Sequence, residues 1–312
     1  MSFIILIIGI FLLIVCADFF VVSCSKMAKS LGIPSLIIGL TIVAMGTSAP
    51  EAAVSITASV KGMNDISLGN VVGSNICNLL LILGCGGLFG SLTAKKKVMT
   101  RDFRFLIFSS AMLLILTFVF FVSNTNEGII TRVNGFMLLG FLALYLYMLV
   151  GDTLKAMHRE VERPKFEFKN IFIAIIGILG IILGGELIVN SATAIATMLN
   201  VSEKVIALTI VAIGTSLPEL VTSVVAVRKG ESDIAVGNVV GSNIFNIYFV
   251  LGLSSAISPI TFATNTFIDV LVMFESSVLV YVLLLMNNRI GHKKAKLLLL
   301  IYAIYMIYIL IR

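Results

Sequence analysis

Charged residues are scarce in this sequence. Only 12% of its 312 residues are Asp, Glu, Lys or Arg, whereas 59% are hydrophobic, and the mean hydropathy is +1.12. That is too little charge to cover a water-soluble globule of this size, so the composition predicts a protein embedded in a bilayer. Ten apolar runs are long enough to cross about 30 Å of hydrocarbon as helices. They cover approximately residues 3–24, 34–60, 67–90, 104–123, 130–151, 170–192, 203–228, 235–259, 266–287 and 295–311.

Cysteine and histidine are rare as well. The four cysteines fall in or beside apolar runs and form no CxxC pair, so they give no disulfide or zinc signal. Both histidines, His158 and His292, fall in predicted loops, which leaves no imidazole near a membrane serine for hydrolysis. Aspartyl-type chemistry would require two glutamates in place of the usual aspartates. The sequence therefore predicts a protein that is not an enzyme and needs no cofactor.

Basic residues are absent ahead of the first apolar run, and that run is too long for the core of a signal peptide, so we expect a retained helix. If the N-terminus is outside, all but four of the 22 Lys and Arg residues fall in cytoplasmic loops, and both termini are outside. These loops could also bind anionic lipid or a partner protein, but they are too scattered to bind nucleic acid. The four exceptions are Lys61, Arg132, Lys204 and Arg312.

A gapless internal repeat runs through the sequence. LTIVAMGTSAPE from Leu40 returns as LTIVAIGTSLPE from Leu208, and DISLGNVVGSNICN from Asp65 returns as DIAVGNVVGSNIFN from Asp233, both at an offset of 168. Residues 39–78 and 207–246 share 25 identities in 40 positions. Each half holds five predicted helices, an odd number, so the second half must lie inverted in the membrane. Inverted repeats are typical of secondary transporters, although channels also carry repeats.

These observations define the expected fold, an all-α integral membrane protein of ten transmembrane helices in two inverted five-helix repeats. The first repeat would span 1–151 with its motif at 39–78, and the second 170–312 with its motif at 207–246. Residues 152–169 would form a cytoplasmic linker. Glycine and proline in the motifs predict that helices 2, 3, 7 and 8 are broken near the membrane midplane, where they would form an ion site.

Two glutamates mark the centres of helices 2 and 7. A lone charge at the position of Glu51 or Glu219 costs at least about 3 kcal/mol in a bilayer. One explanation is local, because Ser48 and Ser216 stand three residues earlier, in the S-x-x-E spacing of a capping box. We expect that geometry at each break, but capping alone does not explain why a membrane helix breaks there. The alternative is a cation site.

The candidate ligands of such a site are all oxygen donors. Carboxylates, hydroxyls, amide oxygens and carbonyls suit calcium or sodium far better than zinc or copper. A site with two negative charges is costly when empty, but one divalent or several monovalent cations would neutralise it, which favours an antiporter over a leak. The predicted ligands are the side chains of Glu51, Glu219, Ser48, Ser216, Ser74, Ser242, Asn78 and Asn246, with the carbonyls of Ala44, Thr47, Ala212 and Thr215.

Four further acidic residues in the predicted helices need separate explanations. Asp18 and Glu186 are related by the repeat but lie away from the midplane, which leaves structural hydrogen bonding or a gate on the ion path as their roles. Asp269 begins helix 9 and is expected at the membrane interface. The repeat assigns no role to Glu275, because its equivalent is Ile107.

The motifs GTSAPE with GNVVGSNICN, and GTSLPE with GNVVGSNIFN, resemble the two α-repeats of sodium/calcium exchangers in the calcium/cation antiporter superfamily. The resemblance implies that Glu51 and Glu219 coordinate calcium and sodium. It also implies that Thr47 and Thr215 supply carbonyls to these ions and that Asn78 and Asn246 lie beside the central site. The four predicted serines and the carbonyls of Ala44 and Ala212 would join at sodium sites. Helices 1 and 6 would slide across the remaining bundle.

The sequence departs from some family members at one position, because archaeal and potassium-dependent exchangers can carry Asp where it has Asn246. That weakens potassium coupling and leaves proton coupling less clearly supported. Eukaryotic members insert a large regulatory domain where this chain has only 152–169, so we expect a prokaryotic type in the plasma membrane. The expected function is Ca²⁺/Na⁺ antiport by a monomeric transport unit. Exchange of calcium for protons or another cation, and a calcium-permeable channel, are the alternatives.

Overall fold

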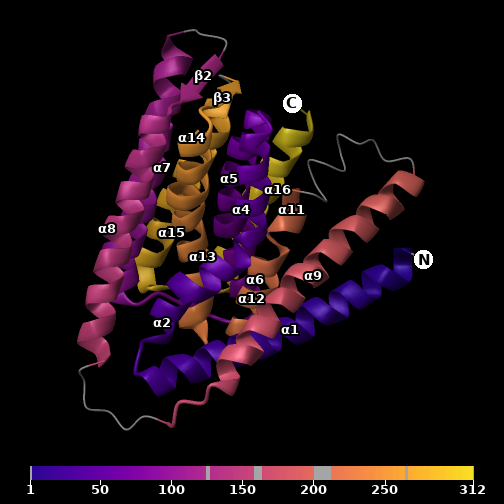
Figure 1. Cartoon of the computed structure of the whole chain (residues 1–312), viewed down its shortest axis with the longest axis vertical. Helices are drawn as coiled ribbons and strands as arrows, with labels where there is room; N and C mark the ends of the chain where they lie inside the picture. Colours follow the sequence, from indigo (N-terminus) through magenta and orange to yellow (C-terminus); the bar gives the residue numbers. More distant parts are fainter. Residues whose placement is uncertain (1, 124–126, 158–163, 200–211, 264–265, 312) are drawn as a thin grey trace.

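The computed structural model describes residues 2–123, 127–157, 164–199, 212–263 and 266–311, and within them the molecule is a bundle of helices (Figure 1). Within these residues, eight single helices are long and apolar enough to cross a membrane: Ser2–Leu31, Ile66–Phe89, Val98–Val122, Arg132–Lys155, Lys169–Met198, Ser232–Ile257, Thr266–Asn287 and His292–Ile311. A ninth crossing is formed by a pair of helices bent at a short break, Ser35–Thr47 and Ala49–Val60. The predicted helix 203–228 is described only from Ala212 onward.

The elements follow one another along the chain in this order. The first half holds α1 (Ser2–Leu31), α2 (Ser35–Ile38), the π-helix η1 (Gly39–Val43), α3 (Ala44–Thr47), α4 (Ala49–Val60), α5 (Asn64–Ile76), the π-helix η2 (Cys77–Ile82), α6 (Leu83–Phe89), β1 (Leu92–Thr93), the π-helix η3 (Val98–Asp102), α7 (Phe103–Val122), β2 (Glu127–Ile130) and α8 (Arg132–Met157). The second half holds α9 (Lys169–Met198), α11 (Ala212–Thr215), α12 (Leu217–Arg228), α13 (Ser232–Phe245), the π-helix η5 (Asn246–Leu251), α14 (Gly252–Ile257), β3 (Ile260–Ala263), α15 (Thr266–Asn287), β4 (Arg289–Ile290) and α16 (His292–Ile311).

The GTSAPE motif interrupts its helix. α3 ends at Thr47, α4 begins at Ala49, and the two parts of the span are bent by 49°. Pro50 lies in the first turn of α4, where its missing amide needs no partner, and Ser48 before it has φ −81° and ψ 9°. The second motif follows the same course, because Ser216, with φ −88° and ψ 6°, separates α11 from α12.

The predicted breaks in helices 3 and 8 are wrong. Residues 66–89 and 232–257 each form one continuous helix. Each contains a π-helical segment, η2 or η5, which shifts the register of the side chains without ending the helix. A motif glycine here allows close packing: a Cβ at Gly241 would lie 2.7 Å from the carbonyl oxygen of Leu40. The helix that contains α13 therefore packs directly against the first part of the bent span.

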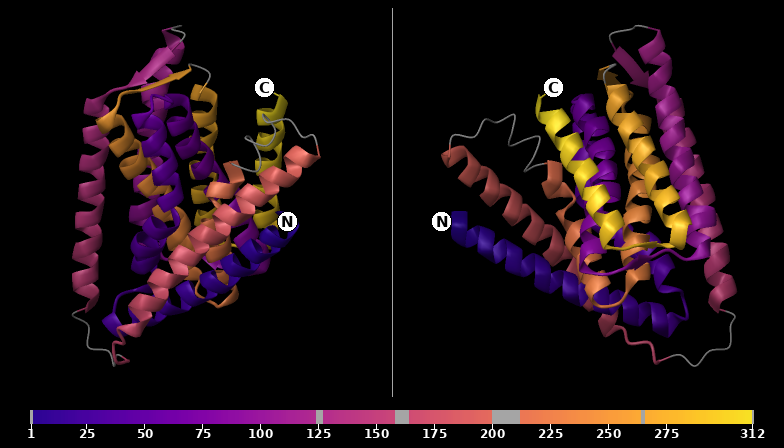
Figure 2. Two further views of the ribbon diagram at one scale, coloured as in Figure 1. Left: turned by 45° about the vertical axis from the view of Figure 1, so that its right-hand side comes forward. Right: turned by 180° about the vertical axis from the view of Figure 1, so that it is seen from behind.

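α1 and α9 differ from the other helices in length and direction. Each has 30 residues, which is about 45 Å of helix and longer than the predicted spans. They pack side by side and run obliquely to the rest of the bundle (Figures 1 and 2). Small residues permit this contact, since a Cβ at Gly184 would lie 2.8 Å from the backbone nitrogen of Leu13. The two helices form a unit against one side of the bundle.

Two short antiparallel ribbons join the halves of the chain. β1 pairs with β4, with Leu92 opposite Ile290, and β2 pairs with β3, with Ile130 opposite Ile260. β1 and β3 follow the third and eighth predicted helices, and β2 and β4 follow the fourth and ninth. β1 is thus equivalent to β3 and β2 to β4, so the β1–β4 ribbon in one repeat frame corresponds to the β3–β2 ribbon in the other. Two repeats related by a pseudo-twofold axis would give this pairing.

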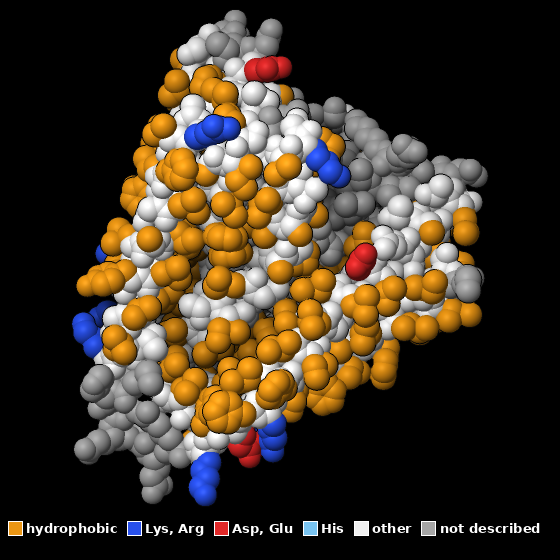
Figure 3. Space-filling view, in the orientation of Figure 1, with side chains coloured by type: hydrophobic (Ala, Val, Ile, Leu, Met, Phe, Trp, Pro, Cys, Tyr) orange, Lys and Arg blue, Asp and Glu red, His pale blue; other side chains and the backbone are white. Residues whose placement is uncertain are grey.

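The helices at the centre of the bundle are almost fully buried, whereas the outer helices are largely exposed. Of the most apolar stretch in 232–257, 94% is buried, whereas for 292–311 the share is 17%. Hydrophobic side chains are spread over the described part of the face shown in Figure 3, where charged side chains are few, which agrees with helices that face lipid. Glu275 is exposed on α15. The inner helices, which carry both motifs, thus surround the buried carboxylates described next.

Candidate cation site

Glu51 and Glu219 occupy equivalent positions in the first turns of α4 and α12. Both side chains are buried, with 0% and 1% exposed. The start of a helix favours a negative charge because its free amides and its dipole are positive at that end. Hydroxyl contacts between the repeats link the two carboxylates, because Ser48, three residues before Glu51, reaches Glu219 and Ser216, three residues before Glu219, reaches Glu51. The two breaks therefore bring both predicted acidic ligands to one buried place.

Each carboxylate accepts a hydrogen bond from the serine of the other repeat. Ser48 donates to Glu219 Oε1 at 2.8 Å, and Ser216 donates to Glu51 Oε1 at 3.3 Å. Neither serine makes a side-chain cap to its own helix. The capping-box prediction is wrong for this reason: the spacing is present, but each hydroxyl turns away from its own helix toward the opposite carboxylate. The site is thus assembled from both repeats rather than within one.

Several buried oxygens of the two glutamates and of the other predicted ligand residues have no hydrogen-bond donor among the described residues. They include Glu51 Oε2 and Glu219 Oε2, one free oxygen on each carboxylate. A buried acceptor without a donor costs free energy, and a cation is a partner that would remove this cost for several oxygens together. The other unpartnered atoms among the predicted ligands are Ser74 Oγ, Asn78 Oδ1 and Nδ2, Asn246 Oδ1 and Thr215 Oγ1. This donor set fits calcium or sodium in ligand type.

The predicted carbonyl ligands are less uniform. The carbonyl of Ala44 accepts the Ser48 amide at 3.0 Å and the Ser242 hydroxyl at 3.4 Å. The prediction that the break frees this carbonyl is therefore wrong. In the second repeat the Ser216 amide bonds to Ile213 at 3.1 Å, so it does not occupy the Ala212 carbonyl. Among the described residues, the carbonyls of Thr47 and Thr215 accept no hydrogen bond from a backbone amide outside the helix that each threonine ends.

Two asparagines that the sequence analysis did not single out support the glutamates. Asn70 donates to the Glu51 carbonyl at 3.2 Å, and Asn238 donates to the Glu219 carbonyl at 3.4 Å. Asn238 also accepts a hydrogen bond of 3.0 Å from the hydroxyl of Thr47, which links α13 to the other repeat. A signal for them was present, because both stand in the repeated sequence GNVVGSN at the offset of 168.

The remaining predicted ligands lie deep in the same region of the bundle. Ser74, Ser242, Asn78 and Asn246 are all buried. Asn246 donates to Asn75 Oδ1 at 3.2 Å, which joins the two long inner helices. The Asn75 amide lies 3.4 Å from the carbonyl oxygen of Asn243, its own equivalent in the second repeat. The region between the repeats is thus lined with amides and hydroxyls on both sides.

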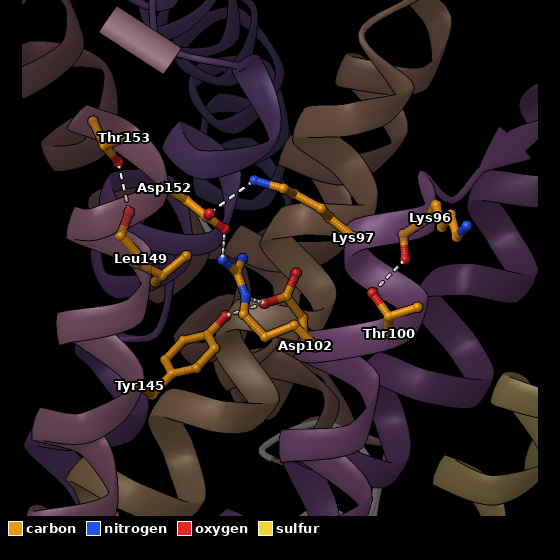
Figure 4. Close-up of polar contacts among 9 residues, drawn as sticks. Lys96, Lys97, Thr100, Asp102, Tyr145, Leu149, Asp152 and Thr153 are labelled. Atoms are coloured by element: carbon orange, nitrogen blue, oxygen red, sulfur yellow. Dashed lines mark hydrogen bonds and ion pairs between the residues drawn. The ribbon is translucent and has the colours of Figure 1, made fainter. Parts of the chain in front are cut away.

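A second buried acid, Asp102, lies elsewhere and, unlike the two glutamates, has a basic partner (Figure 4). Its Oδ1 atom accepts hydrogen bonds from Arg101 at 2.6 Å and from the Tyr145 hydroxyl at 3.1 Å. Arg101 also pairs with Asp152, and Lys97 reaches Asp152 at 2.8 Å. This cluster fixes the start of α7 against α8. The basic residues here, expected as loop charges, in part neutralise the buried Asp102 and the partly exposed Asp152.

The match to known proteins agrees with this geometry. A model of the sodium/calcium exchanger protein family matches residues 1–151 and 169–311. The sodium/calcium exchanger MaX1 of Methanosarcina acetivorans is 32% identical over 341 residues, covering 98% of this chain and 97% of its own length. The inner membrane protein YrbG of Escherichia coli is 38% identical over 265 residues, 81% of this chain and 79% of its own. A solved structure of the sodium-calcium exchanger NCX_Mj superposes with a TM-score of 0.78 at 30% identity, covering 97% of both chains.

This chain belongs to the sodium/calcium exchanger family. It is a multi-pass membrane antiporter and a transporter rather than an enzyme. In this exchanger the two buried carboxylates are linked by the crossed serine contacts, and each carboxylate has one oxygen without a described donor. The other buried acid of the described residues, Asp102, is neutralised by arginine and is not a candidate for the transported ion. The exchanger's ion site is therefore best sought between α4 and α12.

Proposed function

We propose that this exchanger moves Ca²⁺ and Na⁺ in opposite directions across the plasma membrane, through one site that alternates between the two sides. The crossed contact carries the proposal: Ser48 binds Glu219, Ser216 binds Glu51, and one oxygen of each carboxylate has no described donor. Two carboxylates that face each other in a buried place repel strongly unless a cation lies between them.

The proposed ligands follow from the free oxygens. Glu51 and Glu219 supply the charge, and Asn78 and Asn246 supply amide oxygens that have no donor. Ser48, Ser216, Ser74 and Ser242, with the carbonyls of Thr47, Thr215 and Ala212, would complete the calcium and sodium positions. Ala44 is left out because its carbonyl already accepts hydrogen bonds from the Ser48 amide and from the Ser242 and Thr47 hydroxyls. The whole set comes from one chain, which supports a monomeric transport unit.

Charge balance explains why such a site exchanges ions. The doubly negative site is neutral with one calcium ion or with several sodium ions, and both loaded forms can be moved at low electrostatic cost. The unloaded form retains its buried charges, so its movement is disfavoured. Calcium can then cross one way only if sodium crosses the other way.

Uptake into proteoliposomes tests this function. Purified protein is reconstituted into lipid vesicles. The vesicles are loaded with sodium and then diluted into sodium-free medium that contains radioactive calcium. We expect calcium uptake that depends on the outward sodium gradient and that potassium-loaded vesicles do not show. Uptake driven by a pH gradient without sodium would replace sodium by protons as the coupling ion. An ohmic calcium current without sodium in a planar bilayer would indicate a channel, and either result would overturn the proposal.

A further inference from the structure

One end of the α1–α9 unit is tied to the bundle by an ion pair. Lys229, just after α12, lies 2.7 Å from Asp18 on α1, and the two side chains are 31% and 49% exposed. α1 packs along α12 over this region. The acidic partner lies within a membrane-crossing helix, where a charge without a partner is costly.

The repeat places the same two charges at the other end of the unit. Adding 168 to Asp18 gives Glu186 on α9, and subtracting 168 from Lys229 gives Lys61 after α4. The backbone is equivalent as well, because Lys61 has φ −83° and Lys229 has φ −87°, and each precedes a glycine with φ near +75°. The second pair therefore has the same chemistry and the same local geometry as the first.

This second pair is not formed in the structure. Glu186 and Lys61 are both exposed, and neither has an ion-pair partner among the described residues. α9 and α4, the equivalents of α1 and α12, make little contact. The ends of the unit that lie away from α12, the N-terminal part of α1 and the C-terminal part of α9, extend away from the bundle (Figures 1 and 2). In the structure, the Asp18 end of the α1–α9 unit is therefore paired with the bundle, and the equivalent Glu186 end is not. We refer to the paired end as the closed end.

We propose that Asp18–Lys229 and Glu186–Lys61 are alternative ion pairs that form in opposite halves of the transport cycle. In proteins with inverted repeats, each repeat adopts in one state the arrangement that the other adopts in the opposite state. Movement of the α1–α9 unit would separate Asp18 from Lys229 and bring Glu186 to Lys61. The role of these four residues is to position the unit, and the inference rests on the proposed alternating access.

The closed end, at Asp18, has a further ion pair that the repeat does not provide at the Glu186 end. Glu231 accepts hydrogen bonds from Lys29 at 3.1 Å and from Ser25, both on α1. Its repeat equivalent is Met63, and the equivalents of Lys29 and Ser25 are Thr197 and Thr193, none of which is charged. The state seen here is therefore held by two ion pairs and the opposite state by one. We expect the resting equilibrium to favour the state with Asp18 bound to Lys229.

Reversible cross-linking of matched cysteine pairs tests the exchange. Asp18→Cys/Lys229→Cys and Glu186→Cys/Lys61→Cys are compared in the full-length protein with the four native cysteines replaced by serine. A short reducible bis-thiosulfonate reagent is applied in calcium, in sodium, or in chelator without either ion. The control pair, Asp18→Cys/Lys61→Cys, joins positions at opposite ends that the proposed movement never brings together.

We expect both designed pairs to cross-link, with yields that change in opposite directions between ion conditions. Either cross-link should stop transport until a reductant is added, and the control pair should give neither effect. A transporting protein in which Glu186→Cys/Lys61→Cys never cross-links would overturn the proposal, as would transport that continues through cross-linked Asp18→Cys/Lys229→Cys. The cross-linking measurement needs no sodium gradient. If the two yields change in opposite directions but the protein shows no sodium-driven calcium uptake, the ion-pair exchange stands and only sodium as the coupling ion is ruled out.

A charge variant outside both pairs measures the bias. Glu231→Gln removes the tie present only at the closed end, so the ratio of Glu186→Cys/Lys61→Cys to Asp18→Cys/Lys229→Cys yields should rise about 1.5- to 5-fold, the effect of one exposed ion pair. The matched control is Glu167→Gln, which removes an exposed ion pair with Lys169 away from both ends of this contact. An unchanged or lowered ratio in Glu231→Gln would contradict the assigned role of Glu231.

Discussion

The buried carboxylates of this exchanger are stabilised in two different ways, one at Asp102 and the other at Glu51 and Glu219. Asp102 has a guanidinium at 2.6 Å and a phenol at 3.1 Å, so its charge is balanced within the protein. Glu51 and Glu219 have one hydroxyl donor each, from Ser216 and Ser48, and no basic partner among the described residues. An acid balanced by arginine contributes to the fold, whereas a pair left without a cation is suited to bind one.

The largest effect is expected from neutralising the unbalanced pair. Glu51→Gln and Glu219→Gln keep the shape of the side chain and an oxygen that can accept the serine hydrogen bond, but each removes one charge. We expect sodium-driven calcium uptake to fall by more than about 100-fold, beyond the 10- to 100-fold typical of residues outside the first ligand shell. Thermal unfolding in detergent should show that both variants still fold. Preserved transport in either variant would remove that glutamate from the proposed ligand set.

The balanced group should respond in the opposite way. Arg101→Met leaves Asp102 buried without its guanidinium, and loss of one partner of a buried pair lowers the free energy of unfolding by about 3 kcal/mol or more. Transport per folded molecule should change little, because this cluster lies apart from the ion site. The double variant Arg101→Met/Asp102→Asn should recover much of the lost stability. If Arg101→Met unfolds at the wild-type temperature, the pair does not hold α7 against α8.

Asparagines behind the glutamates should have an intermediate effect. Asn238 is fully buried and joins the Glu219 carbonyl to the Thr47 hydroxyl, whereas the equivalent Thr215 hydroxyl has no described partner. Asn238→Ala should weaken the apparent calcium affinity in the uptake assay by about 10-fold, as is typical for outer-shell partners. Asn70→Ala is the matched variant in the other repeat and should weaken it less. Equal losses would show that the Thr47 contact adds nothing.

The sequence predicted the family, the bent helix and the position of both glutamates at equivalent helix breaks, because a repeat of 168 residues marks equivalent positions without a structure. It could not predict that Ser48 binds Glu219 instead of capping its own helix, since this depends on how two distant segments pack. The π-helical segments η2 and η5 were missed because their apolar residues resemble those of any membrane helix. Asn238 was present in the repeated motif, but its contact with the Glu219 backbone spans 19 residues and a helix–helix interface.

Asp102 shows the same limit from the other direction. Arg101 was counted among loop charges that set the orientation, and nothing local in the sequence indicates that its guanidinium turns inward to an acid that is 0% exposed. A neighbouring Asp is usually solvated beside such an arginine. Only the packing of η3 and α7 against α8 excludes water there and brings Tyr145 to the pair.

The smallest predicted effect separates charge balance from hydrogen bonding within the Asp102 group. Tyr145→Phe removes the phenol that donates to Asp102 but leaves Arg101 in place, so the free energy of unfolding should fall by about 1 kcal/mol, the value of one hydrogen bond. Tyr147→Phe on the same helix is the control, because Tyr147 is 77% exposed, and it should leave the unfolding temperature unchanged. If Tyr145→Phe cost as much as Arg101→Met, hydrogen bonding rather than charge would stabilise Asp102. Serine hydroxyls could then stabilise Glu51 and Glu219 in the same way, and the argument that those two carboxylates require a cation would fail.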